Sequence, residues 1–162
     1  MKANKQNESI EVQISSSFEG ADIDLERLTR LVKDICRQFE VLGAAVSIAI
    51  VDDEEMIRIN KEFLRHSHAT DVISFDLSDA TIGTGKHFEL AVNGEQALRE
   101  AGERHHSIQA ELSLYITHGL LHNLGFDDST QEQAKKMHET EDEILQQQGF
   151  GFVYNNSRKT NG

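Results

Sequence analysis

The sequence predicts a single α+β domain with α/β-type layers, in which a small, mostly four-stranded mixed sheet packs against about five helices. Short apolar segments alternate with longer segments whose apolar residues recur every three or four positions. The chain has 162 residues, 38% of them hydrophobic, which is enough for one domain with its own core. We expect a flexible N-terminus at residues 1–8, one folded domain at 9–154 and a flexible C-terminal tail at 155–162.

Four segments have the patterns of strands. Residues 9–15 alternate apolar and polar side chains, as a half-buried strand does. Residues 44–51 are short, apolar and partly β-branched, which favours a buried strand. Residues 71–77 and 88–93 are predicted to form the other two strands, with a glycine-containing loop at 78–85 between them.

Five segments are predicted to be helical: residues 22–40, 53–63, 94–103, 107–124 and 129–148. The glycines Gly43, Gly125 and Gly149 are expected to end the first, fourth and fifth helices.

Polar residues at the helix starts are expected to act as caps. An aspartate of the pair Asp52–Asp53 should cap the second helix. Ser107 should cap the fourth, and the segment 129–132 has the spacing of a capping box for the fifth. The second helix should turn four residues inward: Met56, Ile59, Asn60 and Phe63. The fourth helix should have one apolar face: Ile108, Leu112, Tyr115, Ile116 and Gly119.

Composition restricts the functional classes. The net charge of −12 argues against a sequence-independent nucleic-acid binder with a basic face, although it does not describe a local cleft. The single cysteine, Cys36, excludes an internal disulfide and fits a core position in a reducing compartment. We see no membrane span and no secretory signal, and therefore expect a cytoplasmic protein.

The segment T-H-G-L-L-H-N-L-G-F-D-D, residues 117–128, has the pattern of a metal site. Four residues apart on a helix, His118 and His122 share a face and can point at one ion. Gly125 can then turn the chain back, so that Asp127 or Asp128 reaches the same ion. The alternative is that both histidines are ordinary surface or core residues, but the glycine turn and the acids favour a metal.

The residue after the first histidine bears on the type of enzyme. Metallopeptidases with paired histidines have glutamate there as the general base, whereas this chain has Gly119. The sequence therefore disfavours a metal-dependent peptidase, which remains the less favoured of the alternatives.

Three blocks of the sequence resemble the YbeY family of bacterial single-strand-specific endoribonucleases, which act in ribosomal RNA maturation and ribosome quality control. H-G-L-L-H-N-L-G-F-D-D resembles that family's H-G-x-L-H-L-x-G-Y-D-H signature. N-K-E-F-L-R-H-S-H-A-T-D-V-I-S-F, residues 60–75, resembles its N-x-x-x-R-x-x-x-x-P-T-D-V-L-S-F block. K-K-M-H-E-T-E-D-E-I-L is a weaker match to its last, acidic helix.

The resemblance implies a site at the cleft beside the fourth helix. His118 and His122 would be the first two zinc ligands, and Arg65 would be the catalytic residue that contacts the substrate phosphate. Thr70, Asp71, Ser74 and Phe75 would form the strand beside the cleft.

The chain departs from the family pattern at three positions: Ala69 and Asp76 replace prolines, and Asp128 replaces the third ligand histidine. Two histidines and a carboxylate are a known zinc set, with one ion per chain. A carboxylate ligand also makes another divalent ion, such as manganese, acceptable.

Three alternatives for the third ligand remain open at this point. Asp128 binds the ion, or His138 or Asp127 replaces it, or the site binds metal poorly. Asp127 better suits a role beside the ligands, holding a histidine in its tautomer. Glu111 could do the same but is expected to be a solvated carboxylate, and Glu141 is either a buried acid that supports the site or an interface residue.

The expected reaction is metal-assisted hydrolysis of a phosphodiester in single-stranded ribosomal RNA. No strong general base is visible, and no paired exposed aromatics suggest a stacking platform for RNA. A ribosomal or small-subunit protein partner is expected to position the substrate, and no membrane is involved. The main alternative is a non-catalytic ribosome-assembly factor of the same fold.

Overall fold

The computed structural model describes residues 9–41, 43–64, 70–78 and 85–151. Four strands form one sheet in the order β1-β2-β4-β3: β1 (Ile10–Ser16), β2 (Ala44–Val51), β4 (Lys86–Asn93) and β3 (Val72–Asp76). The first three strands of that order run parallel, and β3 pairs antiparallel with β4 at one edge. The predicted small mixed sheet of four strands is therefore confirmed.

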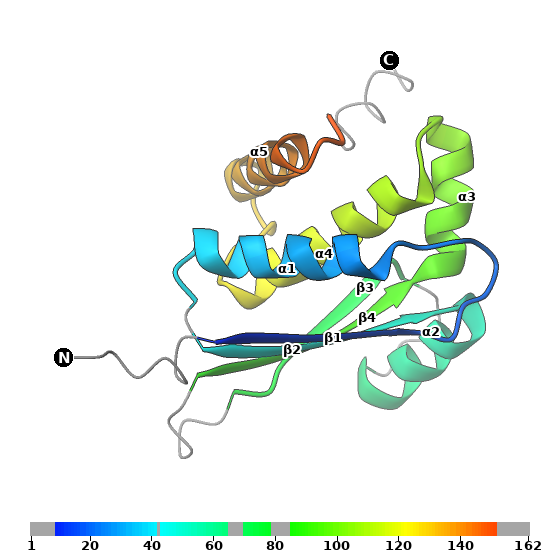
Figure 1. The fold of residues 1–162 in the computed structure, drawn as a ribbon, viewed down its shortest axis with the longest axis horizontal. Coiled ribbons are helices and arrows are strands. Elements are labelled where there is room, and N and C mark those ends of the chain that lie inside the picture. Colours follow the sequence, from blue (N-terminus) through cyan, green and yellow to red (C-terminus); the bar gives the residue numbers. More distant parts are fainter. Residues whose placement is uncertain (1–8, 42, 65–69, 79–84, 152–162) are drawn as a thin grey trace.

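Five α-helices accompany the sheet in the part of the chain that the structure describes: α1 (Leu25–Gln38), α2 (Asp53–Ile59), α3 (Gly94–Arg104), α4 (Ile108–Asn123) and α5 (Gln131–Gln147). The helices α1 and α4 cover one face of the sheet, while α2 lies on the opposite side (Figure 1). Helix α5 lies outside this helical layer (Figure 1). The α+β class and the number of helices agree with the sequence prediction.

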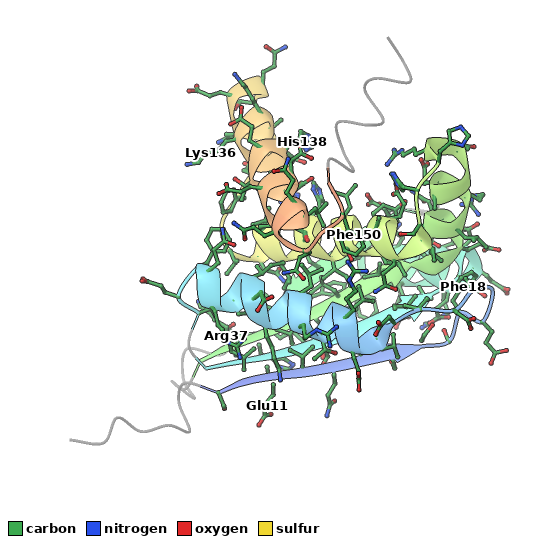
Figure 2. The ribbon with its side chains drawn as sticks, turned by 45° about the horizontal axis from the view of Figure 1, so that its top comes forward. Glu11, Phe18, Arg37, Lys136, His138 and Phe150 are labelled. Carbon is green, nitrogen blue, oxygen red and sulfur yellow. The ribbon has the colours of Figure 1, made fainter. Side chains whose placement is uncertain are left out.

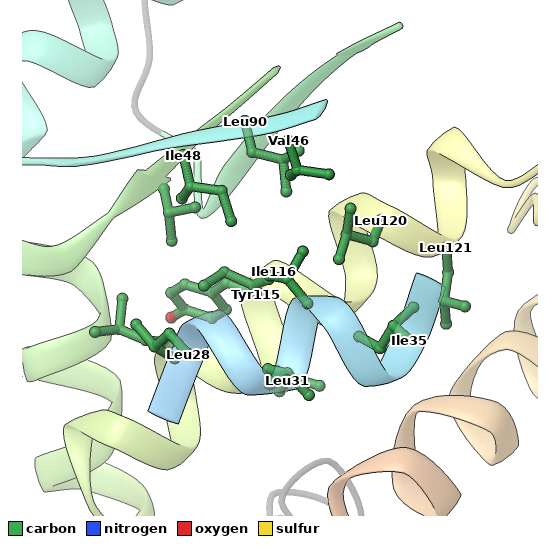
Figure 3. Packing of buried hydrophobic residues seen from close by; sticks show 14 of the residues in the cluster. Leu28, Leu31, Ile35, Val46, Ile48, Leu90, Tyr115, Ile116, Leu120 and Leu121 are labelled. Carbon is green, nitrogen blue, oxygen red and sulfur yellow. The ribbon is translucent and has the colours of Figure 1, made fainter. Parts of the chain in front are cut away.

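The main core lies between the sheet and the pair α1 and α4 (Figure 3). One stripe of α1 is completely buried there: Leu28, Leu31, Val32, Ile35 and Cys36. From β2 and β4 the alternate residues Val46, Ile48 and Leu90 meet it. Polar side chains on the other pleat face the opposite way, as Glu11 does on β1 (Figure 2).

Helix α4 differs from the prediction of a single apolar face. All residues from Ala110 to Thr117 are buried, as are Gly119, Leu120 and Leu121. The sheet, α1, α3 and α5 enclose the helix on all sides. Its half-exposed residues gather near its ends, with His118, His122 and Asn123 at the C-terminal end.

The end of α2 also differs. After Ile59 the chain continues as one turn of π-helix, η2 (Asn60–Leu64). Met56 and Asn60 are buried as predicted, but Phe63 is 59% exposed and contacts Phe75 edge-on, with the ring centroids 5.7 Å apart. The extra residue per turn of a π-helix rotates Phe63 off the inward stripe.

Side chains cap the N-terminal ends of the α-helices as expected. Two details differ from the prediction: the position of one capping box and the C-terminal end of α1. Asp52 and Ser107 accept from the backbone N–H three residues on, as predicted. The capping box of α5 is Thr130 with Gln133, one residue later than predicted. Gly43 does not end α1: that helix ends at Gln38, and Glu40 takes the positive φ of 57°.

The C-terminal end of α5 is attached to α1. The Arg27 guanidinium lies 3.9 Å from the centre of the Phe150 ring, and its Nη2 donates to the Gln148 carbonyl at 2.9 Å. No helix in the described part of the chain is long and apolar enough to cross a membrane.

Asp53 connects α2 to α3 by pairing with Arg99 at 2.6 Å and accepting from Asn93 Nδ2 at 2.8 Å. The Arg99 hydrogen bond, opposed by burial, holds the pKa of Asp53 below its usual value. Such a carboxyl stabilises the fold above its unfolded pKa of about 3.9, and this contribution is lost as the pH falls through the lower folded pKa. Asp53→Asn should therefore cost about 1 kcal/mol at neutral pH, since solvent screens the pair.

Urea unfolding as a function of pH checks this prediction. The stability difference between the wild type and Asp53→Asn should be constant near neutral pH and shrink below about pH 4. A difference that stays constant down to about pH 2 would contradict it.

At Gly119, α4 packs closely against the sheet. A Cβ at this position would lie 2.9 Å from Leu90 Cδ2 and 2.9 Å from Val72 Cγ2. We expect Gly119→Ala to lower the free energy of unfolding by about 1–3 kcal/mol through overpacking. Gly102→Ala on α3 is the matched control, because nothing lies within 4 Å of its Cβ. The control should raise stability by about 0.5–1 kcal/mol in the same thermal or urea unfolding experiment.

Candidate metal centre

The two histidines of the H-x-x-x-H motif lie on one face of α4, at its C-terminal end. Their rings meet edge to face with centroids 4.6 Å apart, and the two Nε2 atoms are 3.2 Å apart. His118 and His122 therefore direct the same ring nitrogen to a common point.

The turn after α4 brings an acid to this point. Gly125 has a φ of +100°, which side chains other than glycine rarely adopt. Backbone hydrogen bonds from Gly125 N to the His122 carbonyl and from Phe126 N to the Leu121 carbonyl close the turn. As a result Asp128 Oδ2 lies 3.7 Å from His122 Nε2 and 3.9 Å from His118 Nε2.

The three atoms fit the donor set of a metal ion. They all lie within 4.8 Å of one another, and this is the one such group of three among the residues that the structure describes. Ligands about 2.0–2.1 Å from one zinc at tetrahedral angles are about 3.3–3.4 Å apart, close to the separations seen. Asp128, at 41% side-chain exposure, leaves one side of the group open to solvent.

A buried carboxylate orients the first histidine. Glu141 on α5 is 1% exposed, and its Oε1 lies 2.7 Å from His118 Nδ1. The carbonyl oxygen of Phe126 lies 3.1 Å from His122 Nδ1. With both Nδ1–H groups donating to these acceptors, both Nε2 lone pairs are left for an ion.

The charge of Glu141 also changes the acidity of His118. Burial alone would lower the pKa of His118, but the hydrogen bond and charge of Glu141, with Asp71 and Asp128, raise it above its usual value. The carboxylates around His118 thus make the electrostatic potential of the site negative, which favours binding of a cation.

Glu141 is the buried supporting acid that the sequence left as one of two alternatives. His138 is not part of the group: its Nδ1 lies 3.4 Å from the other oxygen, Glu141 Oε2. His138 and Lys136 leave α5 on different sides (Figure 2). The tautomer-holding role considered for Asp127 belongs instead to Glu141 and the Phe126 carbonyl, since Asp127 bonds to Asp128 N and Ser129 Oγ.

Glu111 is neither solvated, as predicted, nor beside the ligands. It is 0% exposed and pairs with Arg104 at 3.1 Å and with His106. These partners come from the corner between α3 and α4. The available signal was that Arg104, His106 and Glu111 lie within seven positions of one another. The sequence does not show that the turn between the helices brings their side chains into contact.

The catalytic candidate Arg65 lies outside the described residues, as does Ala69. The block at residues 70–75 precedes and forms β3, and its Asp71 lines a cavity beside His118. Phe75 lies on the other face of the sheet, the face toward α2, where it packs against the cluster that contains Ile73, Met56 and Ala91. The block therefore contributes to both faces of the sheet.

Fold and site together define the class: an α+β protein with two histidines and one carboxylate gathered at the end of a buried helix. The fold matches the solution structure of a protein from Thermotoga maritima with a TM-score of 0.59. The match covers 85% of this chain and 88% of that chain at 21% identity, and so shows the fold.

The comparisons with protein families are more specific. The family model described as Endoribonuclease YbeY matches residues 11–149. A Bacillus licheniformis protein with that name is 36% identical over 117 residues, covering 67% of this chain and 74% of its own length. A Myxococcus xanthus relative of the same name is 31% identical over 153 residues, or 92% of this chain, and the chain spans about half (51%) of that relative. The chain belongs to the YbeY endoribonuclease family, as the sequence motifs predicted.

The role of Glu141 can be tested through metal affinity. Glu141→Gln keeps the size of the side chain but removes the charge behind His118. We expect about 10–100-fold weaker zinc binding, the usual cost of losing a partner behind a ligand, measured by competition with a chromophoric chelator. Glu139→Gln is the control, because its side chain is 67% exposed on the same helix. Equal zinc affinity of the two variants would show that Glu141 has no part in the site.

Proposed function

We propose that this protein is a metal-dependent, single-strand-specific endoribonuclease that acts in ribosomal RNA maturation and ribosome quality control in the cytoplasm. The observation that supports it best is the convergence of His118 Nε2, His122 Nε2 and Asp128 Oδ2 in a chain of the YbeY family. In this proposal the three residues hold one Zn²⁺ per chain, and the carboxylate also admits another divalent ion such as manganese.

The chain's own residues would prepare the site for a phosphodiester. Glu141 and the Phe126 carbonyl fix both rings with Nε2 directed to the ion position. Such an ion, when bound, lowers the pKa of a coordinated water and stabilises negative charge on a phosphate. Arg65 would hold the phosphate by a fork of hydrogen bonds, a role that rests on the family resemblance.

A peptidase has less support. The position that would supply its base is Gly119, where the space for a side chain is filled by Leu90 and Val72. Even a methyl group there would meet the sheet, so a glutamate could not be accommodated without moving α4.

Charge bears on how RNA would be bound. The net charge of −12 opposes the sequence-independent attraction of a polyanion. Arg58 on α2, one of the few cations in this part of the chain, is already paired with Glu55 and Glu62. We therefore propose that a ribosomal or small-subunit protein partner positions the RNA.

A non-catalytic ribosome-assembly factor is the second candidate, because Asp128 stands where the family motif has a histidine. Metal analysis of protein never exposed to chelators, together with cleavage of a single-stranded RNA, separates the two. The enzyme should contain about one equivalent of metal and lose activity on chelation. Protein without stoichiometric metal that binds RNA and does not cut it would establish the second candidate.

Substitutions identify the ligands in the same assays. His118→Ala should lower metal affinity and cleavage by more than about 100-fold, exceeding the usual effect of a residue behind a ligand. Asp128→His should raise zinc affinity and activity if the aspartate is a ligand, because it supplies a third neutral imidazole. His87→Ala on β4 is the control, since His87 is 45% exposed and its contact is with Glu89. Asp128→His with unchanged zinc affinity would remove Asp128 from the ligand set.

A further inference from the structure

A cavity of about 150 Å³ lies beside the metal centre, between α3, α4, α5 and the start of β3. His118 is part of its wall, so the cavity and the metal group share a side chain. Helix α3 contributes Gln96, Glu100 and Arg104, and Asp71 directly precedes β3. The volume is below the roughly 300–1,000 Å³ typical of sites for whole small ligands, and suits one ring of a larger molecule.

The polar groups in this wall are mainly hydrogen-bond acceptors. Arg104 is already committed, with Nη2 3.1 Å from Glu100 Oε2 and Nη1 3.1 Å from Glu111 Oε1. Asp71 uses Oδ1 for the Val72 N–H at 2.8 Å, and no bond is made by its other oxygen in the described part of the chain. The Gln96 amide likewise has no side-chain hydrogen bond to any described residue.

One further polar group lines the cavity without a partner. Tyr115 is 4% exposed, and its hydroxyl has no hydrogen-bond partner among the described residues. Figure 3 shows this hydroxyl directed away from Leu120 and Leu121. Burial, and then the charges of Glu111, Asp71 and Glu100, raise the pKa of Tyr115, so the hydroxyl stays a neutral donor. A buried unpaired hydroxyl costs stability until a ligand group satisfies it.

Two other occupants fit these groups poorly. A phosphate would face the carboxylates of Asp71, Glu100 and Glu141, and the one arginine in the wall is already paired twice. A second metal ion would need three ligand atoms close together, and within the described ranges such a group occurs only at His118, His122 and Asp128.

We propose that this cavity binds a nucleobase of the RNA next to the cleaved bond, and that it selects bases with an exocyclic amino group over uracil. Carboxylate and amide oxygens of Asp71, Glu100 and Gln96 accept from such an amino group, as acidic side chains accept from cytosine N4 and Gln pairs with adenine. The Tyr115 hydroxyl would donate to a ring nitrogen or carbonyl, and the apolar side chain of Leu114 would contact the ring face. This inference rests on the proposed function, because it assumes that RNA lies at the metal centre.

Cytidine and uridine are the probes that test it. Where cytidine has an amino group uridine has a carbonyl, and the adjacent ring nitrogen is an acceptor in cytidine and an N–H donor in uridine. Each nucleoside is titrated into the ¹⁵N-labelled, zinc-loaded full chain, and the amide signals of α3 and the Gln96 side chain are followed. We expect cytidine to bind at least about fivefold more tightly than uridine, the lower limit for one well-matched base contact. Shifts should centre on Gln96, Glu100 and Tyr115.

Two variants and one control assign the effect to the cavity. Glu100→Gln replaces one acceptor oxygen by a donor, so the preference for cytidine should fall toward onefold. Gln96 is a half-buried position on the surface of α3. Gln96→Ala should weaken cytidine binding while the unfolding temperature stays within about 1 °C of the wild type, which corresponds to a few tenths of a kcal/mol. Glu103→Gln removes the same charge from an exposed position of α3 and should keep the wild-type preference.

Equal affinity for uridine and cytidine, or shifts that avoid α3, would overturn the inference. So would Mg²⁺ or inorganic phosphate alone shifting the same signals, which would make the cavity an ion site. Because nucleosides contain no phosphodiester, the result is independent of cleavage. An inactive protein that still prefers cytidine would refute the proposed function and leave base selection by this cavity standing.

Discussion

The close packing of α4 against the sheet at Gly119 is the constraint around which the helices of this domain are arranged. Without a side chain at that position the helix approaches Leu90 and Val72 closely enough to be buried over most of its length. The remaining helices then pack around it and bury even the polar side chains of Glu111, Ser113 and Thr117, while the half-exposed residues lie near the ends of the helix. His118 and His122 occupy its C-terminal end, so the packing that builds the core also confines the candidate metal centre to one exposed corner.

The elements whose signals are local could be predicted from the sequence, and those that depend on neighbours could not. Alternation over residues 9–15 and the apolar run at 44–51 predicted β1 and β2 within one residue. The burial of α4 on all sides arises because other elements enclose it, which no periodicity within the helix reports. Phe63 was misplaced because the π-turn at 60–64 breaks the 3.6-residue repeat on which the prediction depended.

The candidate site likewise contains parts that local sequence signals predict and parts that depend on contacts between distant segments. The spacing of the two histidines and the glycine turn act over a few residues, so the approach of Asp128 was predictable from the sequence. Glu141 meets His118 across 23 positions of the chain, and Glu111 meets Arg104 and His106 around a helix corner. A buried carboxylate in a sequence does not reveal which cation or ring it will face. The substitution of Asp128 for histidine was visible in the motif itself.

The origin of the site in two successive segments has a consequence for local unfolding. His118 and His122 belong to the enclosed helix, whereas Asp128 precedes α5 and Glu141 is on it. Undocking of α5, starting from the Arg27–Phe150 contact at its far end, would take both acids away from the histidines while the sheet stayed folded. Any cation bound by the assembled group therefore favours the docked form of α5 by mass action. In hydrogen exchange the C-terminal helix would then respond to the ion, and the slowly exchanging strands would not.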